Sequence, residues 1–188
     1  MDKLLALKEI YKISPYKKGF KNETTFDEVT VGSPVYGEIT QKGTETVIKK
    51  FSEHFNKNTV FYDLGSGLGK MVAHVGMLCD CKSTGIEYSK ERHAGALEIK
   101  DKFCSDYENI SFKNANVLDL DISDATVVYM DNTVFPNEVT MKMYDSLKSG
   151  CLVLYKLRLK LEGENIEPQD TVDRTYRQGS LCWIIKPW

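Results

Sequence analysis

The chain has 188 residues, a length that fits one domain with a sizeable core. Hydrophobic residues make up 41% of it, charged residues 28%, and the formal net charge is −2. These values are ordinary for a globular protein and exclude a general electrostatic attraction to nucleic acid or to an anionic membrane. No stretch approaches the roughly 20 apolar residues that a membrane-spanning helix needs, so we expect no membrane partner.

The five cysteines are odd in number and follow no disulfide framework spacing: Cys79, Cys81, Cys104, Cys151 and Cys182. Free thiols in a reducing, intracellular compartment are therefore expected. Cys79 and Cys81 form a C-x-C pair, but a second pair and a neighbouring histidine are both missing from the sequence around them. We therefore expect no metal site.

The first 35 residues are polar and rich in lysine, and they predict a short helix from Lys3 to Tyr11 followed by an irregular arm. Residues 36–188 are expected to form a single domain. A helix is predicted to start near Gly43 and Thr44. Its apolar face consists of residues at helical spacing: Val47, Ile48, Phe51 and Phe55.

Apolar strand patterns and helix patterns alternate from residue 60 onward. Strands are predicted over Val60–Leu64, Ser83–Glu87, Ile110–Lys113 and Thr126–Met130, and from Cys151 onward. Helices are predicted over Gly69–Leu78, Lys90–Tyr107 and Asn137–Lys148. This alternation predicts an α/β fold with a mostly parallel sheet and helices on both faces.

The C-terminal segment departs from this alternation. A Gly-Ser turn is predicted at Gly179–Ser180, ahead of the apolar run Leu181–Ile185. The pattern predicts an antiparallel hairpin at the end of the sheet.

A glycine-rich loop, FYDLGSGLGK, runs from Phe61 to Lys70 after the first of these strands. Gly65 and Gly67 allow a ligand to approach the backbone closely. Asp63 would accept hydrogen bonds from an ammonium group and would repel a diphosphate. The G-x-G-x-G spacing also differs from the G-x-G-x-x-G of dinucleotide binders. The loop therefore favours a cationic cofactor without phosphate, namely S-adenosylmethionine. The alternative is a glycine-rich turn without a ligand.

Two further positions favour an adenosine-containing ligand. Glu87 ends the next strand, about twenty residues after the loop, where an acid can accept both ribose hydroxyls. Asn116 can hydrogen-bond the adenine edge while Val117 covers its face. For Asn116, an ordinary Asx turn is an equal alternative.

Polar residues also follow the strand that ends at Met130. Asp131 and Asn132 would lie at the carboxyl end of a buried strand, where ligands bind in doubly wound sheets. Together with Phe135 they could orient an amine and enclose it with an aromatic ring. The alternative is that the pair caps the helix predicted from Asn137.

In their order along the chain, these motifs resemble the disruptor-of-telomeric-silencing family of non-SET histone lysine methyltransferases. The resembling segments are Val35–Glu38, Asp63–Lys70, Gly85–Glu87, Val127–Phe135 and Gly179–Pro187. The resemblance implies a class I methyltransferase, with a Rossmann-like fold and a mostly parallel seven-stranded sheet that ends in an antiparallel hairpin. It also implies S-adenosylmethionine as cofactor and a protein lysine, in a histone or nucleosome, as acceptor. A chromatin substrate would place the protein in the nucleus.

The resemblance also assigns residues to the two ligands. For the cofactor they are Tyr36, Glu38, Thr40, Asp63, Gly65, Gly67, Lys70, Glu87, Asn116 and Val117. For the target lysine they are Asp131, Asn132, Phe135 and Trp183.

The chain departs from the family at several points. Asp131 stands where the family has asparagine, and its charge would favour a protonated lysine unless it accepts a proton or orients the amine. Val117 replaces an aromatic residue. The sequence ends at Trp188, just short of a channel tyrosine. Long N-terminal and basic C-terminal extensions have no counterpart in the sequence, so we expect a minimal relative of the family.

Residues 155–161, YKLRLKL, alternate and would place Lys156, Arg158 and Lys160 on one strand face. This face could contact DNA or a histone surface, or it could simply be the solvated face of an edge strand. Two other functions stay open at this point. One is methylation of another protein amine or of a nucleic-acid amine, and the other is cofactor binding without catalysis.

Overall fold

The computed structural model describes residues 2–14, 37–133, 135–156, 160–161, 164–165, 170–173 and 178–186. Its helices are α1 (Lys3–Lys12), α2 (Gln41–Lys50), α3 (Lys70–Cys79), α4 (Lys90–Phe103), the 3₁₀ helix η2 (Val117–Asp119) and α5 (Asn137–Asp145). The main strands are β1 (Val60–Leu64), β2 (Lys82–Glu87), β3 (Ile110–Asn114), β4 (Val127–Met130), β5 (Leu152–Tyr155), β8 (Asp170–Asp173) and β9 (Gln178–Ile185). Two short strands, β6 (Lys160–Leu161) and β7 (Glu164–Asn165), pair only with each other.

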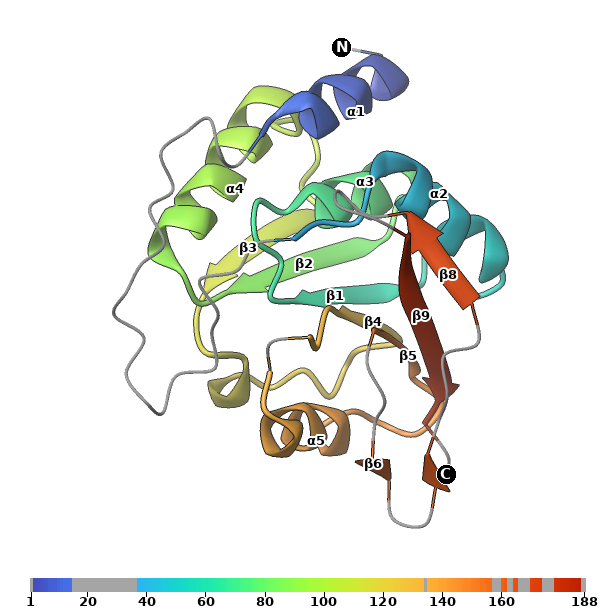
Figure 1. Cartoon of the computed structure of the whole chain (residues 1–188). Helices are drawn as coiled ribbons and strands as arrows, with labels where there is room; N and C mark the ends of the chain where they lie inside the picture. The colour runs from blue at the N-terminus through green and yellow to red at the C-terminus, as the bar shows by residue number, and fades with distance from the viewer. Residues whose placement is uncertain are drawn as a thin grey trace.

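The main strands form one sheet in the order β3-β2-β1-β4-β5-β9-β8 (Figure 1). The first five strands in this order are mutually parallel, and β9 is antiparallel to both β5 and β8. The expected α/β Rossmann-like fold, mostly parallel with an antiparallel C-terminal end, is confirmed. Because β1 lies between β2 and β4, three loops that follow parallel strands meet at one edge of the sheet.

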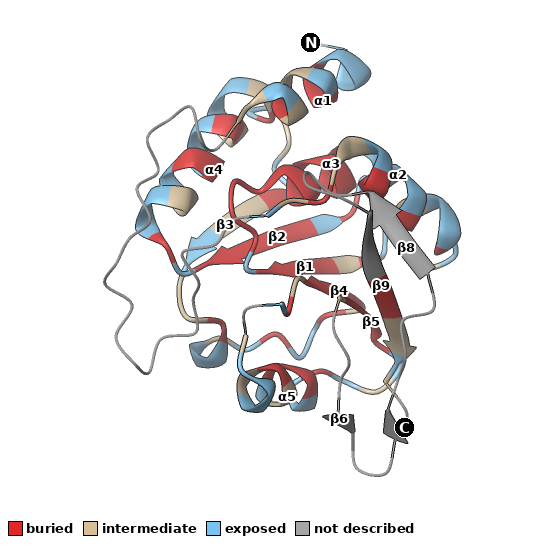
Figure 2. Ribbon diagram, viewed as in Figure 1, coloured by how far each residue is buried: buried red, intermediate tan, exposed pale blue. Residues whose placement is uncertain are grey.

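The two faces of the sheet have separate hydrophobic cores. Side chains alternate along β1, so that Phe61 packs into one core and Tyr62 and Leu64 pack into the other. In Figure 1, α1, α2, α3 and α4 lie above the sheet and α5 lies below it. Figure 2 shows that the central strands β1, β2, β4 and β5 are buried along most of their length. The alternation of burial fixes which side chains reach the edge where β1 ends.

Helix α1 belongs to the upper core. Ala6, Leu7 and Ile10 are each 0% exposed and form one cluster with residues of α2 and α3. Asp2 caps the helix by accepting from the backbone N–H groups of Leu4 and Leu5. The helix predicted near the N-terminus is thus present, and it is integrated into the fold.

Several predicted boundaries were wrong. Helix α4 ends at Phe103, four residues early, because Cys104 is fully buried and leaves the helical conformation. Gly179 and Ser180 pair with Val172 and Thr171 inside the β8–β9 ladder, so they do not form the predicted turn. Within the described residues none of the helices combines the length and apolarity needed to cross a membrane.

Helix α5 also ends earlier than predicted, at Asp145, where the side chain of Lys186 binds the end of the helix. The Lys186 ammonium donates to the backbone carbonyls of Tyr144, Asp145 and Leu147. Two of these carbonyls, those of Tyr144 and Asp145, lie in the last turn of α5, where the regular helical hydrogen bonds run out, and that of Leu147 follows the helix. Lys186 follows β9 directly, so the bonds tie the C-terminal strand to α5.

Replacing Lys186 with alanine should therefore destabilise the protein by about 1–2 kcal/mol, because charge-assisted bonds to three carbonyls are lost. Urea denaturation monitored by circular dichroism measures this. Lys148→Ala is the matched control, since exposed Lys148 makes a single 3.2 Å bond to the Asp124 carbonyl. Equal stability of the two variants would contradict the capping role.

Candidate active site

The loop after β1 is shaped by three glycines in a conformation that side chains disfavour. Gly65, Gly67 and Gly69 have φ angles of 86°, 55° and 71°. The N–H groups of Gly65 and Ser66 both donate to the Ile86 carbonyl, at 2.9 and 3.0 Å, and fasten the loop to the end of β2. Sequence reasoning assigned Gly65 and Gly67 to close ligand approach, and the structure adds the need for positive φ.

Two of the glycines also make room for Phe112, a β3 residue that sequence reasoning did not place in the site. A Cβ on Gly69 would lie 2.2 Å from the Phe112 ring. A Cβ on Gly85 would lie 2.8 Å from the same ring and 2.6 Å from the Ser66 hydroxyl oxygen. Only the strand register, in which Gly85 stands opposite Phe112, reveals this contact.

Glu87 lies at the end of β2, as predicted, and it is 6% exposed. Its carboxylate accepts from the N–H groups of Gly67 at 2.7 Å and Ser89 at 2.8 Å. Burial raises the pKa of Glu87, and these two hydrogen bonds and the charge of Arg92 partly offset the rise. The predicted ribose acid therefore also fixes the glycine loop.

On the other side of the loop lie Asp63, Glu38 and Lys70. Asp63 is the second-last residue of β1 and is 5% exposed. The Lys70 ammonium donates to a Glu38 carboxylate oxygen at 2.6 Å and to the Ile13 carbonyl at 2.6 Å. The structure thus brings together two residues that were predicted separately for the cofactor, Glu38 and Lys70, with Lys70 bound to protein groups.

The residues after β4 reach the glycine loop through Phe135. A Cβ on Gly65 would lie 3.1 Å from the Phe135 ring, so the ring covers the loop at that glycine. The alternative that Asp131 and Asn132 cap α5 was wrong, because Pro136 occupies the cap position without a side-chain bond. Asp131 instead accepts from the backbone N–H and hydroxyl of Thr133.

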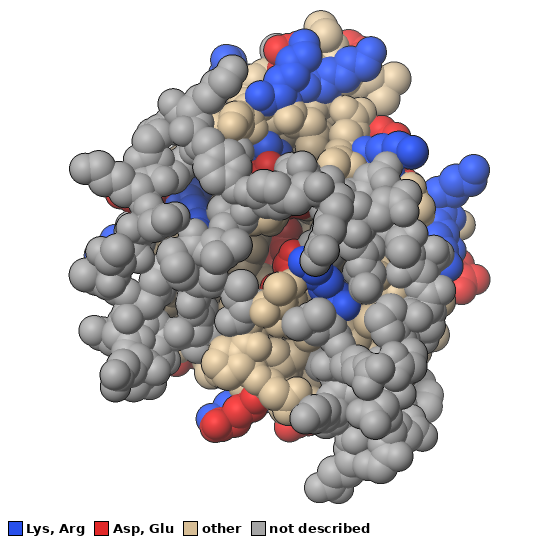
Figure 3. Space-filling model, viewed as in Figure 1, with Lys and Arg blue, Asp and Glu red and all other residues tan. Residues whose placement is uncertain are grey.

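Lys156 does not lie where the sequence pattern predicted it. Strand β5 ends at Tyr155, before Lys156, and Lys160 lies on the separate strand β6, so the predicted single strand face that would carry both was wrong. The Lys156 N–H donates to the Asn132 side chain at 3.0 Å, and its ammonium lies 3.8 Å from an Asp131 oxygen. Figure 3 shows acidic and basic side chains adjoining near the centre of the face in view. Arg158 lies outside the described residues.

The remaining predicted residues have structural contacts of their own. Asn116 caps η2 by accepting from Leu118 N–H, which is the Asx-turn alternative, and Val117 is buried in the lower core. Thr40 caps α2 by accepting from Gly43 N–H at 3.1 Å. Tyr36 lies outside the described residues.

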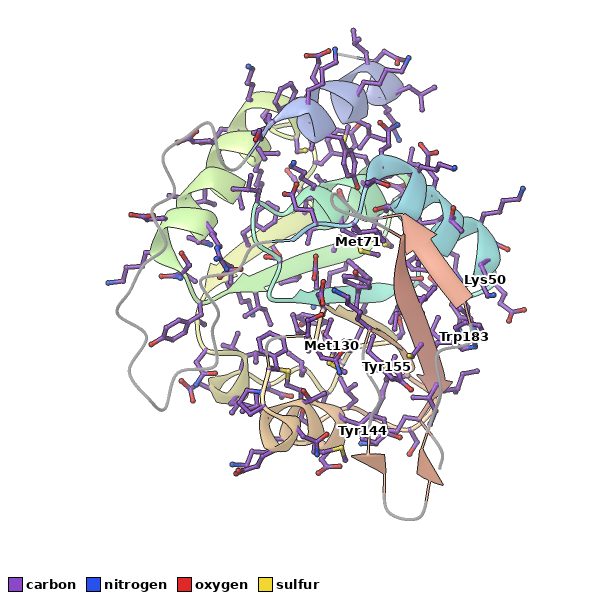
Figure 4. All side chains as sticks on the ribbon, viewed as in Figure 1. Lys50, Met71, Met130, Tyr144, Tyr155 and Trp183 are labelled. Atoms are coloured by element: carbon purple, nitrogen blue, oxygen red, sulfur yellow. The ribbon has the colours of Figure 1, made fainter. Side chains whose placement is uncertain are left out.

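Trp183 lies on the sheet face covered by α2, in the same cross-strand row as Asp63. Its ring stands edge-on to Phe51, with centroids 5.3 Å apart, and the Lys50 ammonium lies 4.2 Å from its centroid. Figure 4 shows Lys50 and Trp183 side by side, with Met130 nearer the middle of the sheet. These contacts anchor β9 to α2.

Solved structures of methyltransferases share this fold. An RNA methyltransferase from Salinibacter ruber, in complex with S-adenosyl-L-homocysteine, matches 80% of this chain and 94% of its own at 21% identity and a TM-score of 0.62. A putative S-adenosylmethionine-dependent methyltransferase from Methanococcus maripaludis matches 77% and 84% at 16% identity and 0.57. The chain spans about half, 49%, of a Geobacter sulfurreducens methyltransferase at 19% identity and 0.53.

The fold and the glycine-loop site define an S-adenosylmethionine-dependent methyltransferase of class I. A family model described as histone methylation protein DOT1 matches residues 16–178, most of the chain. The chain therefore belongs to the DOT1 family of histone methylation proteins, as the sequence motifs indicated. A search of curated protein sequences finds no match.

Cofactor binding should depend on the ionised form of Glu87, which gives a pH dependence. Burial raises the pKa of Glu87 above its ordinary value of 4.5, so the carboxylate takes up its proton at a higher pH than an exposed glutamate does. Cofactor affinity that depends on the ionised carboxylate is therefore lost as the pH falls through this raised pKa. Titration calorimetry with S-adenosylhomocysteine should show weakening with a midpoint above 4.5.

Glu87→Gln removes the charge and keeps an acceptor oxygen for one of the two N–H groups, those of Gly67 and Ser89, that the carboxylate binds. It should bind about tenfold more weakly at neutral pH and lose this pH step. A wild-type affinity that stays flat down to the ordinary glutamate range would refute the role of Glu87.

Proposed function

We propose that the protein transfers a methyl group from S-adenosylmethionine to the side-chain amine of a lysine, and that this lysine belongs to a histone. The observation that carries the proposal is the contact of Phe135 with Gly65. Asp131 and Asn132 follow β4, whose last residue Met130 pairs with Leu64 just before the loop, which supports placing the pair beside the glycine loop. Membership of the histone methylation family supports the choice of acceptor.

The residues at the loop fit this cofactor. S-adenosylmethionine carries an electrophilic methyl group on a sulfonium, an ammonium group and two ribose hydroxyls. Glu87 would accept from the hydroxyls, and Asp63 and Glu38 would accept from the ammonium group. Gly65 and Gly67 would admit the ligand close to the backbone. The Ser66 hydroxyl is buried without a hydrogen-bond partner among the described residues, so the loop retains an unpaired polar group.

Asn116 and Val117 lie after β3, at the same edge of the sheet. We propose that Val117 covers one face of the adenine and that the Asn116 amide reaches its edge. The amide N–H groups suit this role, because the bond to Leu118 uses only the side-chain oxygen. Tyr36 and Thr40 complete the proposed cofactor set.

On the acceptor side, Asn132 and Phe135 would align and enclose the lysine amine. The Asn132 side chain is 4% exposed and is held by the Lys156 N–H, so its orientation is set before a substrate arrives. Methyl transfer needs a neutral amine, and an anionic Asp131 alone would favour the ammonium form. Lys156 offsets that charge. Trp183 would form an outer wall through its place on β9.

The proposal is tested by incubating the protein with isotopically labelled cofactor and with histone octamers, nucleosomes, DNA or RNA. Mass spectrometry should find label on a histone lysine, and Asn132→Ala should reduce transfer by about 100-fold because the amine loses its alignment. Label on nucleic acid alone would overturn the choice of acceptor. Cofactor binding without transfer to any acceptor would indicate a binding protein.

A nucleosomal substrate would place the protein in the nucleus, and a basic surface could contribute to its recognition. Lys156 is engaged with Asp131, which leaves Arg158 and Lys160 as the proposed contacts. Changing both to glutamate should reduce methylation of nucleosomes and spare methylation of free histones, because the charge reversal repels DNA phosphates. Equal rates on nucleosomes for the variant and the wild type would contradict a DNA contact.

Asp131→Asn introduces the residue that the resembling family carries at this position. We expect the turnover number at neutral pH to rise about threefold, because removing a nearby anion makes the neutral form of the bound lysine easier to reach. Steady-state assays on histone octamers measure this, with Asn132→Asp, which adds a charge at the next position, expected to lower it. A fall of more than tenfold in Asp131→Asn would instead identify Asp131 as the proton acceptor.

A further inference from the structure

The end of helix α1 reaches the cofactor side of the molecule through polar contacts. The Tyr11 hydroxyl lies 2.9 Å from the Thr44 hydroxyl of α2 and 3.2 Å from Nδ1 of His74 on α3. Just beyond the helix, the Ile13 carbonyl accepts the 2.6 Å bond from Lys70. Three elements therefore meet at the end of α1, next to the glycine loop.

Lys70 is an unusual residue at its position. It is the first residue of α3, where the helix dipole disfavours a positive charge, and its side chain is 5% exposed. A buried ammonium is stable only with partners that replace water. Its ion pair with Glu38, whose side chain is 9% exposed, and its bond to Ile13 supply them.

The electrostatics of Tyr11 reflect the position of α1 near the carboxylates of Glu38 and Asp63. Burial raises the pKa of the Tyr11 hydroxyl, and the charges of Glu38 and Asp63 raise it further, against a lowering by the Thr44 bond. Burial lowers the pKa of His74 to about 4, so this ring stays neutral at physiological pH. Within the described part of the chain, Lys70 is the cation that pairs with Glu38 at this junction.

We propose that Lys70 is a positioning residue that holds Glu38 in place for the cofactor. Through its bond to the Ile13 carbonyl, Lys70 also makes the end of α1 one wall of the cofactor site. Lys70 acts through Glu38, and Ile13 fixes the ammonium from behind. Helix α1 and Ile13 precede residues 16–178, which the family model matches, so the family pattern does not include this side of the site. The inference concerns cofactor binding and does not depend on the identity of the methyl acceptor.

A double-mutant cycle on cofactor affinity tests the inference. The full chain and the variants Lys70→Met, Glu38→Gln and the double variant are titrated with S-adenosylhomocysteine by calorimetry. If Lys70 acts through Glu38, each single change should weaken binding about tenfold and the double change no more than either one. Tyr11→Phe should weaken it about threefold by loosening α1.

Lys3→Met is the matched control. Lys3 also joins α1 to α3 by a lysine–carbonyl bond, to Met77 at 2.9 Å, but at the other end of the helix. It should leave cofactor affinity unchanged. Thermal unfolding of every variant separates lost binding from lost folding, and Lys70→Gln, which keeps a donor for Ile13, replaces Lys70→Met if the latter does not fold.

Additive losses in the cycle would overturn the inference, since Lys70 would then contact the cofactor independently of Glu38. Wild-type affinity in a folded Lys70 variant would overturn it as well. Cofactor binding that behaves as expected while no histone is methylated would leave the inference standing and reject the proposed acceptor. Conversely, histone methylation with an additive cycle would reject only the inference.

Discussion

The turn between β1 and α3 depends on a backbone that three glycines place in the left-handed region, with φ of 86°, 55° and 71°. The chain can fold back over the end of β2 only because a single carbonyl, that of Ile86, accepts from two successive N–H groups. The Glu87 carboxylate then holds the loop from the ligand side. Each predicted cofactor contact is placed relative to this turn, so an error there would displace all of them.

Charge balance is the second constraint on the site. The carboxylates of Asp63, Glu38 and Glu87 suit a cationic ligand, yet they lie in largely buried positions where like charges repel one another. Lys70 relieves this repulsion at the loop, and Lys156 does the same for Asp131, which we propose to lie on the acceptor side. Both lysines are thus parts of the electrostatics of the site although neither needs to touch a ligand.

Strand–helix alternation and the glycine motif were sufficient to predict the fold, and the bounds of β1 were predicted to the residue. Local patterns report burial and backbone conformation, which is why they succeeded there. They could not show that Phe112 fills the space beside Gly69 or that Lys156 turns toward Asp131, because both contacts join segments far apart in sequence. The early end of α5 could not be predicted for the same reason, because Lys186, which binds the Tyr144 carbonyl there, lies 42 residues further along the chain.

The packing of Phe112 against Gly69 and Gly85 has an evolutionary consequence. A ring fills the space that a side chain at either glycine would need, so the three positions share one fixed volume. Alanine at position 85 would need more room at both Phe112 and Ser66, because a Cβ there would also lie 2.6 Å from the Ser66 hydroxyl oxygen, whereas position 69 stays restricted by its φ of 71°. A substitution at position 85 should therefore accompany changes at positions 66 and 112 among relatives, and position 69 should stay glycine.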